Sequence, residues 1–356
     1  MLLQDLRDRT FRRLLKLPER WISRAVGAPV VRDGQTLDVQ TQAMLAAIKL
    51  AGIKDEQDVG RARAAMDLEV GAVSPPPVAM RRERDLVIPI GDGPTKVALP
   101  ARLYVPKSAP SEPPLLVFFH GGGFVTGGLH SHRRIAGRIT RAAGVPLLNV
   151  DYRQLPVAHI TETVADALHA YEHLLELGFA PEKIVFAGDS AGGGLAFATA
   201  LAARERRLPL PGGIAAIAPW ADLDPARRRA HPNDRKDAVL SAFTLSVPAL
   251  VGFAGGGDLD PLWSPVNHDF TGLPPVFIQV GSTEVLLADA EQLAQRCREA
   301  AVPCTVQIWD RALHVFQAGA DILPDARAAI ADMGRTIRAF VDTDAPSLPT
   351  GRSTAA

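Results

Sequence analysis

One stretch of the sequence decides the fold, Gly188-Asp189-Ser190-Ala191-Gly192-Gly193-Gly194. It follows the short apolar run 184–187 and precedes the apolar segment 195–203, which predicts a buried strand, a tight turn and a helix in that order. So sharp a turn leaves no room for side chains two residues before and two residues after Ser190, hence the glycines. Gly-x-Ser-x-Gly at a strand-to-helix turn is typical of a nucleophilic serine at the edge of an α/β sheet.

The alternative interpretation of this turn is a phosphate-binding loop. Such a loop requires Lys followed by Ser or Thr after its glycines, and neither this turn nor Gly255-Gly256-Gly257-Asp258 carries that pair. Asp189 would also repel a phosphate group. We therefore interpret the first stretch as a nucleophile site and the second as an ordinary turn.

Short apolar runs alternate with helical stretches on both sides of this turn. Runs rich in Val, Ile and Leu at this length are typical of strands buried on both faces, and their alternation with helices predicts a mostly parallel sheet. The eight candidate strands, of which the first two form an antiparallel pair, are 85–90, 97–105, 115–119, 147–150, 184–187, 214–218, 276–280 and 305–309. The predicted fold class is α/β, with ligands bound at the carboxyl ends of the strands.

The motif His120-Gly121-Gly122-Gly123-Phe124 directly follows one of these strands. Attack on an ester passes through a tetrahedral oxyanion, which needs hydrogen-bond donors fixed in advance. Consecutive glycines let backbone N–H groups approach that oxygen, and a glycine loop before the nucleophile is the order expected for this fold. We expect the oxyanion donors to be the N–H groups of Gly121, Gly122 and Ala191, with His120 holding the loop.

A general base should follow the last strand, because the triad of this fold runs in the order serine, acid, histidine. Of the nine histidines, only His314 lies beyond residue 268. The acid should lie on the loop after the strand 276–280, where Glu284 and Asp289 are the candidates. We favour Glu284, which is nearer the end of the strand. Asp289 should already belong to the next helix and is kept as the alternative acid.

With these motifs in view, the sequence resembles the bacterial hormone-sensitive-lipase family of esterases. The matching segments occur in order along the chain: His120-Gly121-Gly122-Gly123-Phe124, Asp151-Tyr152-Arg153, Gly188-Asp189-Ser190-Ala191-Gly192-Gly193, Ser264-Pro265, Leu273-Pro274-Pro275 and His314-Val315-Phe316. The resemblance implies an α/β-hydrolase fold with a helical N-terminal cap, and hydrolysis of short acyl esters without a cofactor. It also implies oxyanion donors at Gly121, Gly122 and Ala191, and a homodimer of the kind that many members form.

The sequence departs from the family pattern at two places. The family usually has Asp-Pro-Leu at the acid, where this chain has Glu284-Val285-Leu286. After Asp151-Tyr152-Arg153 the family usually continues Leu-Ala-Pro-Glu, where this chain has Gln154-Leu155-Pro156-Val157. The first departure makes the acid the assignment that depends most on structure, and the second alters a loop near the predicted site.

The sequence divides into three segments. We assign residues 1–84 to a helical cap and residues 85–343 to the catalytic domain, which has a loop and helical insertion at 221–275. Residues 344–356, rich in Pro, Ser, Thr and Gly, are expected to form a flexible tail. Leucines and basic residues interleave near the N-terminus, which predicts an amphipathic helix on the main domain, with a lipid-surface anchor as the alternative.

Composition limits the classes of function. The 356 residues hold 39 Lys+Arg against 39 Asp+Glu, so the basic bias of a nucleic-acid-binding protein is missing. Cys297 and Cys304 are too few for a disulfide scaffold, and no spacing is typical of a metal site, so we expect neither metal nor cofactor. The N-terminus lacks a signal-peptide pattern, and no apolar run approaches the ~20 residues of a membrane helix. We therefore expect a cytoplasmic protein without stable membrane insertion.

Two classes of function fit these motifs. The first is a serine carboxylesterase acting on small-molecule esters, with Ser190 as nucleophile, His314 as base and Glu284 as the acid that orients the base. The second is a non-catalytic protein that binds small ligands on the same fold, since fold does not fix function. Loss of catalysis usually shows as a missing serine or histidine, and both are present. Acyl transfer and amide hydrolysis would use the same three residues.

Overall fold

The computed structural model describes residues 78–90, 97–110, 113–155, 157–254 and 258–342, together with two short strands, β1 (Val31–Arg32) and β2 (Gln35–Thr36). These two strands pair with each other in antiparallel fashion. Most of the predicted cap and the predicted tail lie outside the described residues, as does the glycine run 255–257.

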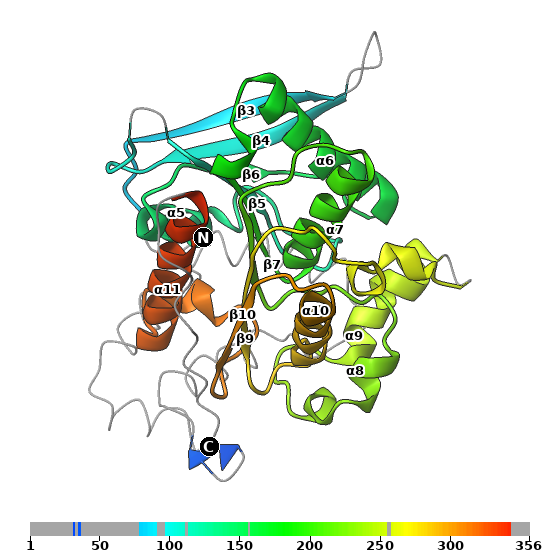
Figure 1. The fold of residues 1–356 in the computed structure, drawn as a ribbon. Coiled ribbons are helices and arrows are strands. Elements are labelled where there is room, and N and C mark those ends of the chain that lie inside the picture. The colour runs from blue at the N-terminus through cyan, green and yellow to red at the C-terminus, as the bar shows by residue number, and fades with distance from the viewer. Residues whose placement is uncertain are drawn as a thin grey trace, which may run out of the picture.

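One eight-stranded sheet runs through the molecule (Figure 1). In chain order its strands are β3 (Arg82–Ile90), β4 (Val97–Val105), β5 (Leu115–Phe119), β6 (Leu147–Val150), β7 (Ile184–Asp189), β8 (Gly213–Ile217), β9 (Val276–Gly281) and β10 (Cys304–Trp309). They lie side by side in the order β10-β9-β8-β7-β5-β6-β4-β3. Strand β4 is antiparallel to both of its neighbours, and every other pair is parallel. The predicted fold class is confirmed.

The central strands are buried because they are apolar on both faces. Every residue of β5, β7 and β9 is buried, as a strand covered by helices on both sides requires. At the sheet edge, β3 begins at Arg82, so the boundary that we set at residue 84 falls inside this strand. The charged residues 82–84 concealed its start, because an edge strand tolerates charge that a central strand would exclude.

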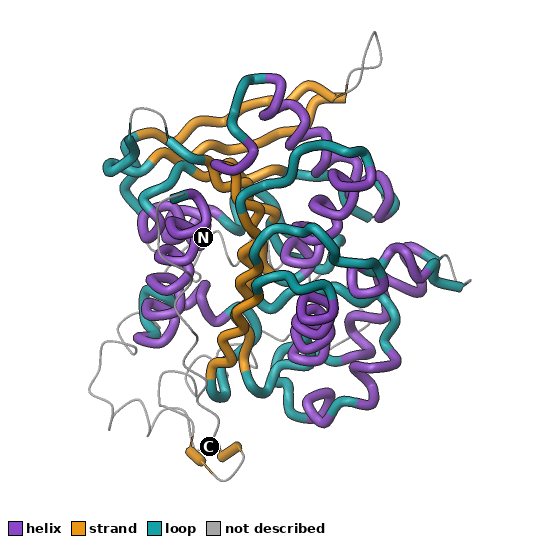
Figure 2. Tube along the Cα trace, viewed as in Figure 1, coloured by secondary structure: helices purple, strands orange, loops and turns teal. Residues whose placement is uncertain are grey.

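Helices cover both faces of the sheet (Figures 1 and 2). Helices α5 (Arg133–Ala143) and α11 (Pro324–Val341) pack together on one face, and α6 (Ile160–Glu176), α7 (Ala191–Glu205) and α10 (Leu287–Glu299) lie on the other. Helix α7 starts directly after the turn that holds Ser190, and α10 starts shortly after β9. The carboxyl ends of the strands therefore lead into the loops that carry the predicted site.

The insertion leaves the sheet after β8 and returns at β9, its neighbour in the sheet. Its described part holds two short α-helices, α8 (Ala226–Ala230) and α9 (Ala242–Ser246), and the π-helix η3 (Val247–Phe253). It also holds the 3₁₀ helices η2 (Pro232–Arg235), η4 (Pro261–Trp263) and η5 (Pro265–Asn267); two others, η1 (Pro181–Lys183) and η6 (Phe316–Gly319), lie in the main domain. The insertion therefore connects two neighbouring parallel strands of the sheet.

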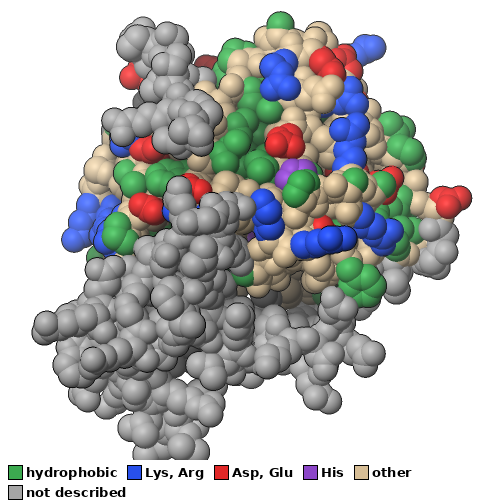
Figure 3. All heavy atoms as spheres, turned by 90° about the horizontal axis from the view of Figure 1, so that it is seen from below, with side chains coloured by type: hydrophobic (Ala, Val, Ile, Leu, Met, Phe, Trp, Pro, Cys, Tyr) green, Lys and Arg blue, Asp and Glu red, His purple; other side chains and the backbone are tan. Residues whose placement is uncertain are grey.

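The surface carries charges of both signs. Figure 3 shows the molecule from below, where acidic and basic side chains occur among apolar ones and a strip of hydrophobic side chains runs between them. This mixture agrees with the balanced composition of the chain. Within the described residues, no helix combines the length and apolar character needed to cross a membrane.

Candidate active site

Ser190 lies in the turn between β7 and α7, as the sequence predicts. Its backbone has a φ of 53°, in the left-handed region that residues with side chains rarely adopt. Hydrogen bonds hold this conformation: the N–H of Ser190 donates to the carbonyl of Ile217 over 2.8 Å. The carbonyl of Ser190 accepts from the N–H groups of Gly194 at 3.1 Å and Trp220 at 2.9 Å. Such strain persists only where the surroundings fix it, and it is common at active sites.

Gly188 and Gly192 are required by crowding around this turn. A Cβ atom on Gly192 would lie 1.9 Å from the carbonyl oxygen of Phe119, and one on Gly188 would lie 2.3 Å from the carbonyl oxygen of Gly192. Both clashes are with backbone atoms, which cannot rotate away as a side chain can. The glycine pattern around Ser190 therefore has a steric cause, as we inferred from the sequence.

His314 and Glu284 are in direct contact. Nδ1 of His314 lies 2.7 Å from Oε2 of Glu284, and their side chains are 11% and 1% exposed. The other carboxylate oxygen, Oε1, accepts the N–H of Gly281 over 2.6 Å. Glu284 follows β9 and His314 follows β10, so both come from the carboxyl ends of parallel strands, the same edge at which Ser190 follows β7. The bond to Glu284 orients the imidazole through Nδ1 and leaves Nε2 for another partner.

The loops that carry this pair are tied to each other. The N–H of Ser282 donates to the carbonyl of Trp309 over 2.8 Å, and the N–H of Arg311 donates to Oγ of Ser282 over 2.7 Å. A Cβ atom on Gly281 would lie 2.1 Å from the carbonyl oxygen of Ala312, so the loops also approach closely. This arrangement limits the relative movement of Glu284 and His314.

The surroundings of His314 favour its protonated form. Burial by itself would lower its pKa, but the hydrogen bond and negative charge of Glu284 and the charges of Asp237 and Asp189 together raise the pKa above its ordinary value. An imidazolium that forms at this position is therefore stabilised. Since Asp189 directly precedes Ser190, its effect also links His314 to the nucleophile turn.

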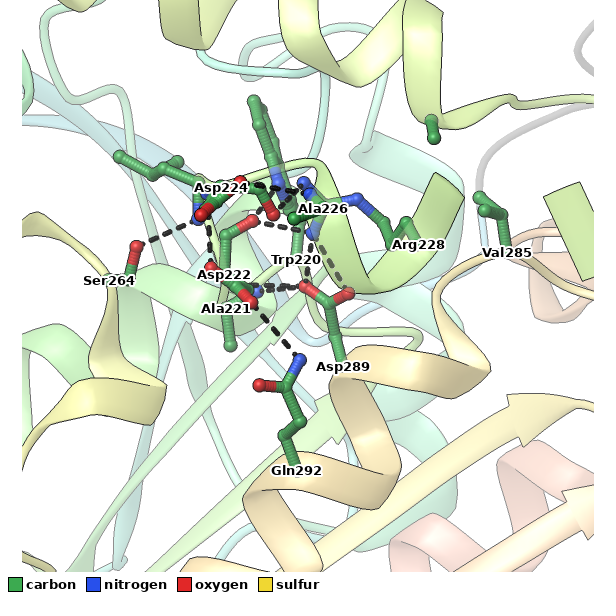
Figure 4. Close-up of polar contacts among 12 residues, drawn as sticks. Trp220, Ala221, Asp222, Asp224, Ala226, Arg228, Ser264, Val285, Asp289 and Gln292 are labelled. Atoms are coloured by element: carbon green, nitrogen blue, oxygen red, sulfur yellow. Dashed lines mark hydrogen bonds and ion pairs between the residues drawn. The ribbon is translucent and has the colours of Figure 1, made fainter. Parts of the chain in front are cut away.

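Asp289, the alternative acid, lies in a different network. It is fully buried in the first turn of α10. Its carboxylate accepts the N–H groups of Ala221 and Asp222, each over 2.9 Å, and the guanidinium of Arg228, also over 2.9 Å. Figure 4 shows these contacts, with Gln292 donating to Asp222 from below. The structure does not bring Asp289 to His314, and instead makes it an anchor for the start of the insertion.

The N–H groups expected as oxyanion donors differ in their hydrogen bonds. The N–H of Gly121 donates to Oδ1 of Asp189 over 3.0 Å and to Nε2 of His132 over 3.2 Å, so this group is already occupied. Within the described part of the chain, the N–H groups of Gly122, Gly123 and Ala191 have no acceptor. The N–H groups of Gly122, Gly123 and Ala191 are therefore free to donate to a ligand, whereas that of Gly121 already has two acceptors.

A second serine–histidine–aspartate array lies beside this loop, and sequence reasoning missed it. Oγ of Ser131 lies 2.9 Å from Nδ1 of His132, and Nε2 of His132 lies 3.3 Å from Oδ2 of Asp189. Oγ of Ser131 is also bonded to the N–H and the carbonyl of Gly128, so it is engaged within its own loop. The array joins the glycine loop to the nucleophile turn. In the sequence, the one sign of it was Asp189, an acidic residue between Gly188 and Gly192 of that turn.

Burial would raise the pKa of Asp189, but the histidines and the N–H of the glycine loop lower it below its ordinary value. Asp189 is thus held as a carboxylate. His120 holds the loop from the other side, as we expected, because it is fully buried and stacks on Tyr152 with ring centroids 4.4 Å apart. The hydroxyl of Tyr152 donates to the carbonyl of His120 over 2.5 Å.

Fold and site together define a class of enzyme. A mostly parallel sheet with a serine in a strained turn after β7, an acid after β9 and a histidine after β10 is the arrangement of α/β hydrolases. Residues 116–318 match the family described as alpha/beta hydrolase fold.

Comparison with known proteins narrows this class. The chain is 39% identical over 223 residues to an acetyl-hydrolase of Streptomyces hygroscopicus, a match covering 63% of this chain and 75% of the relative. It is 38% identical over 229 residues to the esterase LipU of Mycobacterium tuberculosis, covering 63% and 77%. A crystal structure of an esterase from the bacterial hormone-sensitive lipase family has a TM-score of 0.78 and 30% identity, covering 86% of this chain and 100% of that chain.

The chain therefore belongs to the α/β-hydrolase family, and within it to the esterases of the bacterial hormone-sensitive-lipase type. This confirms the resemblance inferred from the motifs. The protein is a hydrolase of carboxylic esters.

Proposed function

We propose that this esterase cleaves short-chain acyl esters through a triad of Ser190, His314 and Glu284, without a metal or cofactor. One observation supports this proposal above all others: the 2.7 Å contact between Nδ1 of His314 and the nearly inaccessible carboxylate of Glu284. A carboxylate in this position holds the imidazole in the tautomer that leaves Nε2 as a proton acceptor.

In the first half of the reaction, Oγ of Ser190 attacks the ester carbonyl carbon while Nε2 of His314 accepts the serine proton. The carbonyl oxygen becomes an oxyanion, for which the N–H groups of Gly122, Gly123 and Ala191 are the donors. The C–O bond to the alcohol then breaks, and His314 returns its proton to the departing alkoxide. Ser190 is left as an acyl ester.

In the second half, water replaces the alcohol. His314 accepts a proton from the water as its oxygen attacks the acyl carbon, and the same donors face the second oxyanion. Collapse of this intermediate breaks the bond to Oγ of Ser190, which recovers its proton from His314 and releases the carboxylic acid. Glu284 stays ionised and stabilises the imidazolium in both halves.

A preference for short acyl chains is supported by the resemblance stated above and by the name of one relative, the acetyl-hydrolase of Streptomyces hygroscopicus. We expect the rate to be highest with acetate, butyrate or octanoate esters of p-nitrophenol and lower with the palmitate ester. Faster hydrolysis of emulsified long-chain triglyceride would contradict this part of the proposal and would favour the lipid-surface alternative for the N-terminal segment.

The nucleophile is tested by Ser190→Ala. We expect kcat/KM for p-nitrophenyl acetate to fall on the order of 10⁴-fold or more, because the covalent route is lost. Ser131→Ala is the matched control, since this serine also contacts a histidine that bears on an aspartate. It should keep most of the activity. An Ser190→Ala enzyme with a tenth of wild-type activity, or a dead Ser131→Ala enzyme that is still folded, would refute the assignment.

A further inference from the structure

A segment of the insertion grips the loop that carries Glu284. Oδ2 of Asp237 accepts the N–H of Val285 over 2.7 Å. Oδ1 of Asp237 accepts the N–H groups of Val239 and Leu240 over 2.8 Å and 3.0 Å. The carboxylate therefore bridges two segments, with one oxygen on its own turn and the other on the residue that follows Glu284. The bridge depends on a backbone N–H at Val285, which a proline at this position would lack.

Asn233 provides a second grip on the same loop. It is 4% exposed, and its side-chain amide donates to the carbonyl oxygens of Ser282 and Glu284, each over 2.9 Å. The N–H of Asp237 donates to the carbonyl of Asn233 over 2.8 Å, so the two gripping residues belong to one turn. Asn233 therefore binds two carbonyl groups of the loop and Asp237 binds one N–H group. These groups belong to residues 282, 284 and 285, so they lie at Glu284 and close to it along the chain.

Asp237 also brings charge to the site. The carboxylates that act on His314 come from three elements: Glu284 from the loop after β9, Asp189 from the end of β7, and Asp237 from the insertion. Glu284 touches the imidazole and Asp189 belongs to the nucleophile turn. Asp237 is the one of the three that lies outside both the acid loop and the nucleophile turn.

We propose that Asp237 is a positioning residue for ester hydrolysis, which holds the loop carrying Glu284 in place and supplies a further negative charge to the surroundings of His314. This inference rests on the proposed triad. The insertion then helps to position His314 through Glu284, because the bridge links the segment between β8 and β9 to the acid loop.

The expected pH effect follows from the sign of this charge. His314 must be neutral to accept a proton, so the acidic limb of kcat/KM reports its pKa in the free enzyme. A carboxylate near an imidazole favours the protonated form and moves that limb to higher pH. Removing the charge of Asp237 should therefore move the limb to lower pH, by roughly 0.3–1 unit.

The test compares Asp237→Asn with wild type, using soluble p-nitrophenyl acetate across a pH series. Asn presents an N–H₂ group where one of the two carboxylate oxygens now accepts an N–H, so the loop loses a bond as well as a charge. We expect kcat to fall roughly tenfold, since small misplacement of a catalytic group is costly, and the acidic limb to shift downward. Asp237→Ser is the second variant, because a hydroxyl still caps its own turn while lacking the charge and the reach to Val285.

Asp234→Asn is the matched control. Asp234 lies in the same segment and accepts the N–H of Ala242 over 2.6 Å, and no hydrogen bond joins it to the acid loop within the described residues. Its variant should keep the kcat and the acidic limb of wild type. Thermal melts confirm that each variant is folded.

Glu284→Gln, measured in parallel, separates this inference from the proposed function. If Glu284→Gln is crippled while Asp237→Asn and Asp237→Ser keep the wild-type limb, Asp237 has no positioning role, even where their kcat is lower. If Glu284→Gln turns over normally, the proposed triad itself is wrong and the inference falls with it. A lower limb in both Asp237 variants, with Asp234→Asn unchanged and Glu284→Gln crippled, supports the proposal.

Discussion

Glu284 and Asp289 belong to the same short segment after β9 but have different surroundings. Glu284 faces an imidazole, whereas Asp289 faces a guanidinium and two backbone N–H groups. Arg228 and Asp289 are both fully buried, so each neutralises a charge that would be costly if left alone. The two carboxylates are therefore expected to respond differently to loss of charge.

We expect Asp289→Asn to lower the free energy of unfolding by about 2–4 kcal/mol, because it leaves Arg228 buried without its counter-charge. The catalytic rate of the folded fraction should stay within about tenfold of wild type. Glu284→Gln should show the reverse pattern, with kcat lower by roughly 10²–10⁴-fold and little change in KM. Chemical denaturation and steady-state kinetics on the same preparations measure both effects.

Glu291→Gln is a suitable control, because Glu291 lies on the same helix as Asp289 with a side chain 59% exposed. It should leave stability within about 0.5 kcal/mol of wild type. An Asp289→Asn enzyme that melts like wild type and has lost its activity would show that the triad runs through Asp289.

Residue roles could be predicted from the sequence only where the cause is local. The role of Ser190 is predicted by the glycines on either side of it, and that of His314 by its place after the last strand. The occupation of the Gly121 N–H could not be foreseen, because its acceptor Asp189 is 68 positions away and three consecutive glycines look equivalent in a sequence. The contact between Asp237 and Val285 spans 48 positions, and no pattern in the sequence connects them.

At the scale of elements, the strand β7, the turn and helix α7 form one unit. The turn packs against the end of β5, where the carbonyl of Phe119 occupies the space that a side chain at position 192 would need. The nucleophile turn and the strand before the glycine loop are therefore in backbone contact. This contact fixes the distance between the two parts of the site that come from different strands.

Gly192→Ala tests this packing. We expect a loss of about 3 kcal/mol or more in the free energy of unfolding, with a large loss of activity, because a backbone oxygen cannot yield to the new methyl group. Gly137→Ala is the control: it lies within α5, and its new Cβ atom would meet side-chain carbon of Val78 at 3.3 Å. That variant should stay within about 1 kcal/mol of wild type. Equal melting temperatures for the two variants would contradict the steric account of the turn.

The elements themselves were largely predictable, since buried strands and amphipathic helices leave strong patterns. All eight predicted strands occur, with ends that differ by up to three residues. The start of β3 was missed because charged residues at a sheet edge resemble a loop. The interior of the insertion was predicted only as loop and helix, since its short helices are fixed by contacts such as that of Arg228 with Asp289 rather than by their own sequence.

At the scale of the whole molecule, hydrolysis should not depend on a metal. Among the residues that the structure describes, no group of three or more His, Cys, Asp or Glu side chains could hold a metal ion. We expect dialysis against EDTA to leave kcat/KM for p-nitrophenyl acetate unchanged, because the mechanism uses backbone N–H groups where a metal would otherwise polarise the ester. Activity that disappears with EDTA and returns with added Zn²⁺ would contradict the mechanism.

The order of strands in the sheet has a consequence for synthesis on the ribosome. β7 pairs with β5, and then β8, β9 and β10 each add to the strand made just before them. Each strand that leaves the ribosome can therefore pair with a strand that is already formed, which favours folding during translation. The nucleophile follows β7, its acid follows β9 and its base follows β10. A nascent chain that lacks these later strands therefore carries Ser190 without its acid and base. It can hydrolyse esters only after β10 and the loop that follows it have folded.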